Sequence, residues 1–134
     1  GMEWSLSEEE LLPIRSEFVL ASRFGDLEPP IDTVFIHIKE HNAYLKSCQN
    51  VLKLGFQGKM CIHPDQVAVT NKTFTPSEEK VVWSKRVISE FERAEAEGVA
   101  SIQVDGYFVD YPIVEKAQRV VDMSNLLNDL ASSK

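Results

Sequence analysis

The residues best suited to chemistry gather in one short segment, Gly55–Val67, which reads GFQGKMCIHPDQV. Within it Lys59 offers a cation beside a glycine, and His63 offers an imidazole whose reference pKa of about 6.5 suits proton transfer or phosphate contact. The apolar triplet Met60–Ile62 is typical of a short buried strand, and His63-Pro64 opens the next helix. Because α/β proteins place their chemistry where a strand runs into a helix, the segment predicts a ligand-binding site.

A helix must precede this segment near the start of the chain. It begins either at Ser7, in a capping box with Glu10, or with Pro13 as its first residue. Gly25 is expected to end it. Its apolar side chains recur at helical spacing and predict one buried face, made of Leu11, Ile14, Phe18 and Ala21.

Two predicted strands are separated by a second helix. The run Asp32–Ile38 is mostly apolar and β-branched, as is typical of a buried parallel strand. The residues from Tyr44 to Leu52 show helical spacing, and Gly55 ends that helix before the strand Met60–Ile62. The order helix, strand, helix, strand, helix predicts an α/β fold, either a βα barrel or a doubly wound sheet.

The second half of the chain has a different pattern. A long helix is predicted over Pro76–Glu97, with Thr75 as its N-cap and Glu78 closing a capping box. Two short strand-like pieces over 100–109 are joined at Asp105-Gly106, a pair that favours a hairpin turn. A last helix follows from Pro112. Asp110, just before it, stands where an N-cap of that helix would lie.

Composition excludes several functional classes. The chain has 134 residues, enough for one domain of modest core, and a formal net charge of −7. Nucleic-acid binding is not expected, because a phosphate-backbone binder shows clustered Lys and Arg. No apolar run approaches the roughly 20 residues that span a bilayer, and no secretory leader is visible. Cys48 and Cys61 lack metal-ligand spacing and are expected to be core residues of a reduced, intracellular protein.

The wording GFxGKxxIHPxQ, together with DGxxxDxP around Asp110, resembles the citrate lyase beta-subunit-like (HpcH/HpaI aldolase) family. The resemblance runs from about Leu11 to Leu127 and covers only the family's C-terminal portion. It implies an α/β fold: residues 2–75 would be the last two strands, with their helices, of a TIM (β/α)8 barrel. Residues 76–134 would be a helical C-terminal extension with a short hairpin, serving oligomerisation and as an active-site lid.

The resemblance also implies ligand contacts. In the family this strand and its loop line the acyl-CoA thioester, partly through backbone groups, which assigns substrate binding to Lys59, Met60, Cys61, His63 and Pro64. The residues alone leave other readings open. Lys59 is equally well explained as a surface lysine whose stem covers the rim of the barrel. His63 is favoured as a structural residue that caps the next helix, or as one that orients the ligand.

Asp110 is the catalytic candidate, because the matching aspartate in related lyases reaches a neighbouring subunit and exchanges a proton at the acetyl carbon. The alternative is a routine N-cap, and both roles can hold at once. The resemblance implies magnesium as cofactor, held by carboxylates on earlier strands that this chain does not contain. His37 departs from the family, whose members usually carry an acidic residue there.

Two functions compete. The first is the C-terminal portion of a magnesium-dependent carbon–carbon lyase acting on a citramalyl-CoA or malyl-CoA type of thioester, in a cytoplasmic or mitochondrial-matrix homo-oligomer without membrane contact. The second is a truncated, non-catalytic paralogue or fragment that serves in oligomerisation. A third reading, a phosphate-binding domain using Gly58-Lys59, is weaker because the spacing matches no glycine-rich phosphate loop. We expect the chain alone to be inactive.

Overall fold

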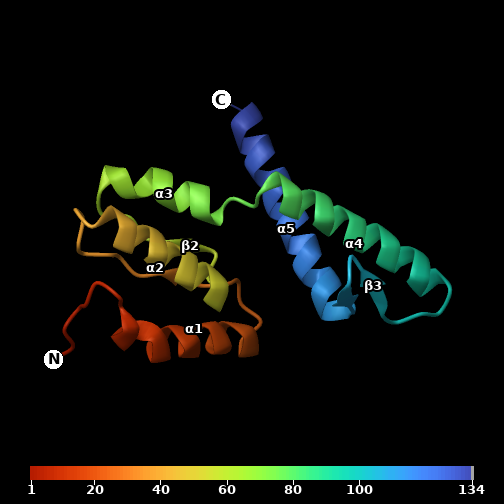
Figure 1. Cartoon of the computed structure of the whole chain (residues 1–134), viewed down its shortest axis with the longest axis horizontal. Coiled ribbons are helices and arrows are strands. Elements are labelled where there is room, and N and C mark those ends of the chain that lie inside the picture. Colours follow the sequence, from red (N-terminus) through yellow and green to blue (C-terminus); the bar gives the residue numbers. More distant parts are fainter. Residues whose placement is uncertain (134) are drawn as a thin grey trace. The chain divides into compact units, whose positions relative to one another are not determined.

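The computed structural model describes residues 1–133 and divides into two compact units, Gly1–Phe74 and Thr75–Lys134 (Figure 1). Each unit is described by itself. The first is α/β and the second pairs two long helices with a small hairpin. The last residue of the predicted extension, position 134, lies outside the described residues. Among the described residues, no helix combines the length and the apolar character needed to cross a bilayer.

The first unit alternates short strands with helices. Its elements are the 3₁₀ turn η1 (Glu9–Leu11), α1 (Leu12–Phe24), β1 (Ile31–Asp32), α2 (His41–Leu54), β2 (Gly58–Lys59) and α3 (Pro64–Phe74). Pro13 lies in the first turn of α1, where its missing N–H costs no hydrogen bond. The predicted Ser7–Glu10 box is wrong, because Ser5 makes the contacts: its backbone N–H and hydroxyl both donate to the Glu10 carboxylate.

Gly55 ends α2 as predicted. Its φ of 112° is a left-handed conformation that residues with a Cβ adopt only under strain. The backbone N–H of Gly55 donates to the carbonyls of Val51 and Leu52, which closes the helix and turns the chain toward β2.

The two strands run parallel but are shorter than expected. Ile31 pairs with Gly58 and Asp32 with Lys59, and the N–H of Met60 donates to the carbonyl of Asp32 at 3.0 Å. The predicted strand Met60–Ile62 is therefore wrong, because β2 ends at Lys59, and the predicted strand Asp32–Ile38 coincides with β1 only at Asp32. Among the described residues each strand has a single partner, so the ladder ends once the two segments diverge.

The core of the first unit lies between α2, α3 and the segment after β1. Phe35, Tyr44 and Cys48 form its buried cluster, and the rings of Phe35 and Tyr44 lie 5.6 Å apart. Buried Gln66 ties this core to the loops, because its amide donates to the Phe35 carbonyl and accepts from the Ile62 N–H. Cys48 is buried as predicted, whereas Cys61 is exposed, which corrects that part of the prediction.

The predicted apolar face of α1 is mostly uncovered. Leu11 is buried, but Ile14 and Phe18 are 42% and 60% exposed. Ile31 is also 60% exposed. The expectation that this helix face lies in a core is therefore wrong for the unit as it stands, because helical spacing selects a face but does not supply what covers it.

The second unit contains α4 (Glu78–Ala96), β3 (Ile102–Val104), β4 (Tyr107–Val109) and α5 (Tyr111–Ser132). The strands form an antiparallel hairpin, and Asp105 and Gly106 both have positive φ, as the predicted turn requires. Ser77, rather than Thr75, caps α4 by accepting from the Lys80 N–H. The core of the unit consists of Val87, Phe91, Val104, Val109 and Ala117.

Candidate functional site

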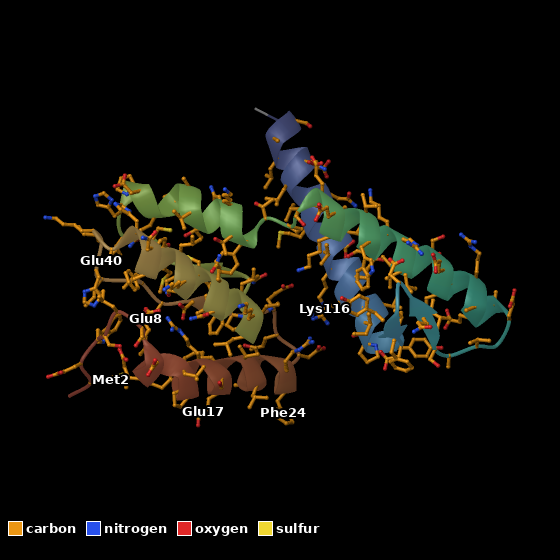
Figure 2. All side chains as sticks on the ribbon, in the orientation of Figure 1. Met2, Glu8, Glu17, Phe24, Glu40 and Lys116 are labelled. Atoms are coloured by element: carbon orange, nitrogen blue, oxygen red, sulfur yellow. The ribbon has the colours of Figure 1, made fainter. Side chains whose placement is uncertain are left out.

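Four charged side chains are buried together in the first unit. We call Glu8, Arg15, Asp32 and Lys59 the ion cluster; each is 7% exposed or less. They come from four places: the turn before η1, helix α1, strand β1 and strand β2. Figure 2 labels Glu8, which lies between the ribbons of α1 and α2. Buried charges require close partners, so the contacts within this cluster determine what it does.

The strongest contact joins Arg15 to Asp32. The Nε of Arg15 donates to one carboxylate oxygen and Nη2 to the other, both at 2.8 Å, in a two-bond arrangement that fixes orientation. Burial opposes the charge on Arg15, but its hydrogen bonds to Asp32 and Glu8 outweigh that effect and raise the pKa of the guanidinium above its ordinary value. Arg15 therefore stays charged and anchors α1 to β1.

Lys59 is the second cation of the cluster. Its Nζ donates to Asp32 Oδ2 at 2.5 Å and lies 3.7 Å from Glu8 Oε1, and its side chain is 0% exposed. The two residues are partners in the parallel ladder, which places their side chains on one face of the sheet. The alternative of a surface lysine is therefore wrong. The ammonium is buried against Asp32, so any contact of Lys59 with a substrate outside the ion cluster must use its backbone.

Glu8 completes the cluster from outside any helix. Its Oε2 accepts from Arg15 Nη2 at 2.9 Å and from the hydroxyl of Ser47 on α2. Among the described residues, its Oε1 is buried with no hydrogen-bond partner. The cluster thus balances two cations against two carboxylates and connects α1, α2 and both strands.

An apolar cavity of about 260 Å³ adjoins the cluster, with Arg15 and Asp32 in its wall. The rest of the lining is nearly all apolar and includes the exposed side chains of α1 and of the strand edges. The other lining residues are Leu11, Ile14, Phe18, Ile31, Thr33, Phe56 and Met60. This surface binds or packs against apolar groups more readily than charged ones.

Beyond β2, the predicted ligand contacts Met60 and Cys61 are accessible. Met60 is 50% exposed, and the Cys61 thiol lies 3.3 Å from the Thr70 hydroxyl and 3.5 Å from the Tyr44 hydroxyl. Burial, with the Cys61 contact, raises the pKa of Tyr44, so its hydroxyl stays protonated. The structure thus gathers polar side chains at the carboxyl end of β2, and the substrate role of these residues stays a prediction.

His63 and Pro64 open helix α3. The N–H of Asp65 donates to His63 Nδ1 at 3.3 Å, and the carboxylate of Asp65 lies 3.5 Å from the same nitrogen. His63 therefore caps the start of its own helix, as the structural alternative expected. A role of His63 in orienting a ligand stays a prediction.

Asp110 lies in the second unit and caps α5. Its Oδ1 accepts from the N–H of Ile113 at 3.4 Å, and Pro112 occupies the first turn. The capping role is therefore present. The catalytic role stays a prediction, because it concerns a neighbouring subunit.

Sequence reasoning missed three members of the ion cluster: Glu8, Arg15 and Asp32. Glu8 stands in the acidic run Glu8–Glu10, a pattern typical of a solvated surface, so nothing in the sequence marks it as buried. Signals for the other two were present, because Arg15 interrupts the apolar stripe of its helix and Asp32 opens an apolar strand. A single charged residue inside an apolar pattern predicts a buried partner of opposite charge. For Asp32 that partner is Lys59, as well as Arg15.

The described residues do not fit a magnesium site. They hold no group of three or more His, Cys, Asp or Glu side chains that could bind a metal. The buried carboxylates of Glu8 and Asp32 are already bound to Arg15, Ser47 and Lys59. Magnesium requires near-octahedral oxygen ligands, which these two side chains cannot offer.

No family model matches the chain, but comparison with known proteins finds relatives that are named as lyases or lyase subunits. Citrate lyase subunit beta of Leuconostoc mesenteroides subsp. cremoris is 33% identical over 94% of this chain and 41% of its own length. Mitochondrial citramalyl-CoA lyase of Rattus norvegicus is 28% identical over 90% of the chain and 36% of its own length. The chain therefore spans about two fifths of the curated relatives it matches.

A solved structure has the same fold. The CitE protein of Mycobacterium tuberculosis, in complex with magnesium, acetoacetate and coenzyme A, matches 93% of this chain and 46% of its own length. The TM-score is 0.73 and the sequence identity 25%. The helix-rich α/β arrangement of this chain thus occurs within a larger protein.

Proposed function

Because this chain is related to the citrate lyase beta-subunit-like family and corresponds to its C-terminal portion, we propose that it supplies the CoA-thioester contacts of a carbon–carbon lyase. The observation that carries the proposal is the match over 94% of the chain to a citrate lyase beta subunit, together with the fold shared with a CoA-bound protein. In this proposal β1 and β2 are the last two strands of a (β/α)8 barrel.

The residues after β2 would contact the thioester. Met60 and Cys61 are exposed at the strand's carboxyl end, and His63 and Pro64 begin α3, whose N-terminal N–H groups favour negative charge. Lys59 holds this segment in place, because its buried ammonium ties β2 to Asp32 and thereby to α1. We therefore assign Lys59 the role of positioning residue and the following four residues that of contacts.

Asp110 would supply the proton. Cleavage of the carbon–carbon bond leaves an electron pair on the carbon beside the thioester carbonyl, and that carbon must take up a proton. A carboxyl group delivered by Asp110 from a neighbouring subunit would serve as this acid, and the same group would act as base in the reverse reaction. We assign no magnesium ligand to the described residues, and no step of the proposal passes through a metal.

The second candidate function is oligomerisation without catalysis. The exposed apolar side chains of Ile14, Phe18 and Ile31 favour it, because they need a covering surface. So does the lack of a metal-binding group among the described residues. Both observations are equally compatible with the C-terminal portion of a lyase. The sequence similarity to a citrate lyase subunit and a citramalyl-CoA lyase favours the lyase function.

A chimaera tests the lyase proposal. The segment of the rat citramalyl-CoA lyase that aligns with this chain is replaced by the chain, and cleavage of citramalyl-CoA is measured. We expect cleavage that Asp110→Asn reduces roughly 10²–10⁴-fold, as for a lost general acid. A chimaera that assembles like its parent but cleaves no thioester would favour the oligomerisation module.

A further inference from the structure

Glu8 enters the ion cluster in an unusual way. It precedes η1, and its backbone is left-handed with φ 53°. The residue is nevertheless only 3% exposed. Residues other than glycine adopt this conformation only under strain, which the contacts of the carboxylate must offset. We call the segment Trp4–Glu10 the tether, because it holds one carboxylate in a buried position.

The carboxylate of Glu8 is surrounded by donor groups from three different elements. The donors are Arg15 on α1, Ser47 on α2 and Lys59 on β2. Without Glu8, the cluster would hold two cations against the single carboxylate of Asp32. One positive charge would then be buried without compensation, which is strongly unfavourable. These three donors therefore form an anion-binding pocket.

Glu8 fills this pocket incompletely. Its Oε2 accepts hydrogen bonds from Arg15 and Ser47, but its buried Oε1 has no hydrogen-bond partner among the described residues. Lys59 Nζ lies 3.7 Å from Oε1, beyond hydrogen-bond distance. A free carboxylate, which carries no backbone constraint, can shift within the pocket and bring its second oxygen to Lys59.

The tether itself is held mainly by exposed, local contacts. Ser5 bonds to Glu10 through its backbone N–H at 2.8 Å and its hydroxyl at 2.7 Å, both exposed. Apart from the contacts of the Glu8 side chain, the segment reaches the rest of the unit where the carbonyl of Trp4 lies 3.1 Å from His37 Nε2. Segments with such contacts open locally at much lower cost than a core does.

We propose that Arg15, Ser47 and Lys59 form a binding pocket for a small carboxylate, which Glu8 occupies as a tethered intramolecular ligand. A free monocarboxylate such as formate or acetate competes with Glu8 for the pocket. When it binds, the segment Trp4–Glu10 is released from α1 and α2. The pocket is separate from the thioester contacts after β2, so this proposal stands or falls independently of the lyase function.

The test uses the whole chain with Glu8→Gly, which removes the carboxylate and suits the left-handed backbone. Thermal unfolding is followed while sodium chloride is replaced by sodium formate at constant ionic strength. We expect the melting temperature to rise with saturation. At ten times the dissociation constant, linkage raises the folded-to-unfolded ratio about elevenfold. Formamide, which has the same shape without the charge, should have no saturable effect.

Two variants serve as controls. Glu9→Gly makes the same charge change at an exposed neighbour and should show no saturable response to formate. Glu8→Gly/Lys59→Met removes the excess positive charge and should lose the response of the single variant. If Glu8→Gly is unfolded in chloride, recovery of its circular dichroism with formate supports the pocket. No recovery with formate, or an equal response in Glu9→Gly, overturns the proposal.

Discussion

Lys59→Met should destabilise the first unit strongly. Methionine retains most of the apolar stem but removes the ammonium, which is 0% exposed and bound to Asp32. Glu8 Oε1, already without a hydrogen bond among the described residues, then also loses the ammonium 3.7 Å away. The cluster is left with two carboxylates and one guanidinium, so a negative charge is buried without compensation. Removing one partner of such a buried pair costs about 3–5 kcal/mol.

Urea unfolding followed by amide exchange measures this cost separately in each unit. With a denaturant dependence of about 1–3 kcal/mol/M, the midpoint of the first unit should fall by at least about 1 M. Amides of α4 and α5 in the second unit should keep their protection. Lys39→Met, at an exposed lysine of the same unit, is the matched control and should change stability by less than about 0.5 kcal/mol.

A double variant separates charge balance from packing. Glu8→Gln added to Lys59→Met returns the cluster to one cation and one carboxylate. The two changes should therefore cost less together than the sum of the single variants, by about 0.5–3 kcal/mol. Additive costs, or a Lys59→Met variant as stable as Lys39→Met, would refute the view that Lys59 is held by a buried ion cluster.

Three further predictions follow from the structure. Asp110→Asn should leave the stability of the chain unchanged, because Asn caps helices as well as Asp, whereas Asp110→Ala should cost about 0.5–2 kcal/mol in thermal unfolding; a costly Asn variant would contradict this. The chain should not be a monomer at micromolar concentration, because Ile14, Phe18 and Ile31 are exposed beside unpaired strand edges, and light scattering after size exclusion would show a monomer mass if this is wrong. Calorimetric titration with magnesium chloride should show no micromolar site, because the described residues offer no metal-binding group, and a saturable heat would refute it.

Local signals were readable from the sequence where one residue type is required by the backbone. Gly55 at φ 112° and the Asp105-Gly106 turn were both anticipated, because few residues tolerate positive φ. The capping alternative for Asp110 was also readable, because a carboxylate just before a helix that starts with Pro112 can accept from the first free N–H groups. Such features depend on neighbours within three or four positions, so a single sequence is enough to find them.

Long-range features were not readable in the same way. Neither the substrate contact nor the surface position proposed for Lys59 anticipated its ion pair, because its partner Asp32 lies 27 residues away and only the pairing of β1 with β2 brings them together. Both strands were misplaced, because their apolar runs begin where the two-residue ladder ends and the pairing of β1 with β2 alone decides where that ladder lies. The burial of Glu8 gives no sequence signal, because its neighbours Glu9 and Glu10 make the run typical of a solvated surface. The resemblance to a lyase family depends on the wording of residues 55–67 and was confirmed by the relatives.

Binding of coenzyme A to this chain, mapped by amide chemical shifts, tests the central claim most directly. We predict concentration-dependent shifts at Met60, Cys61, His63 and Asp65, where the segment leaves β2 and begins α3. Pantetheine and adenosine 3′,5′-bisphosphate, added separately, distinguish contacts of the thiol arm from those of the nucleotide. Shifts confined to other parts of the chain, or none at millimolar coenzyme A, would contradict the claim that this segment contacts an acyl-CoA thioester.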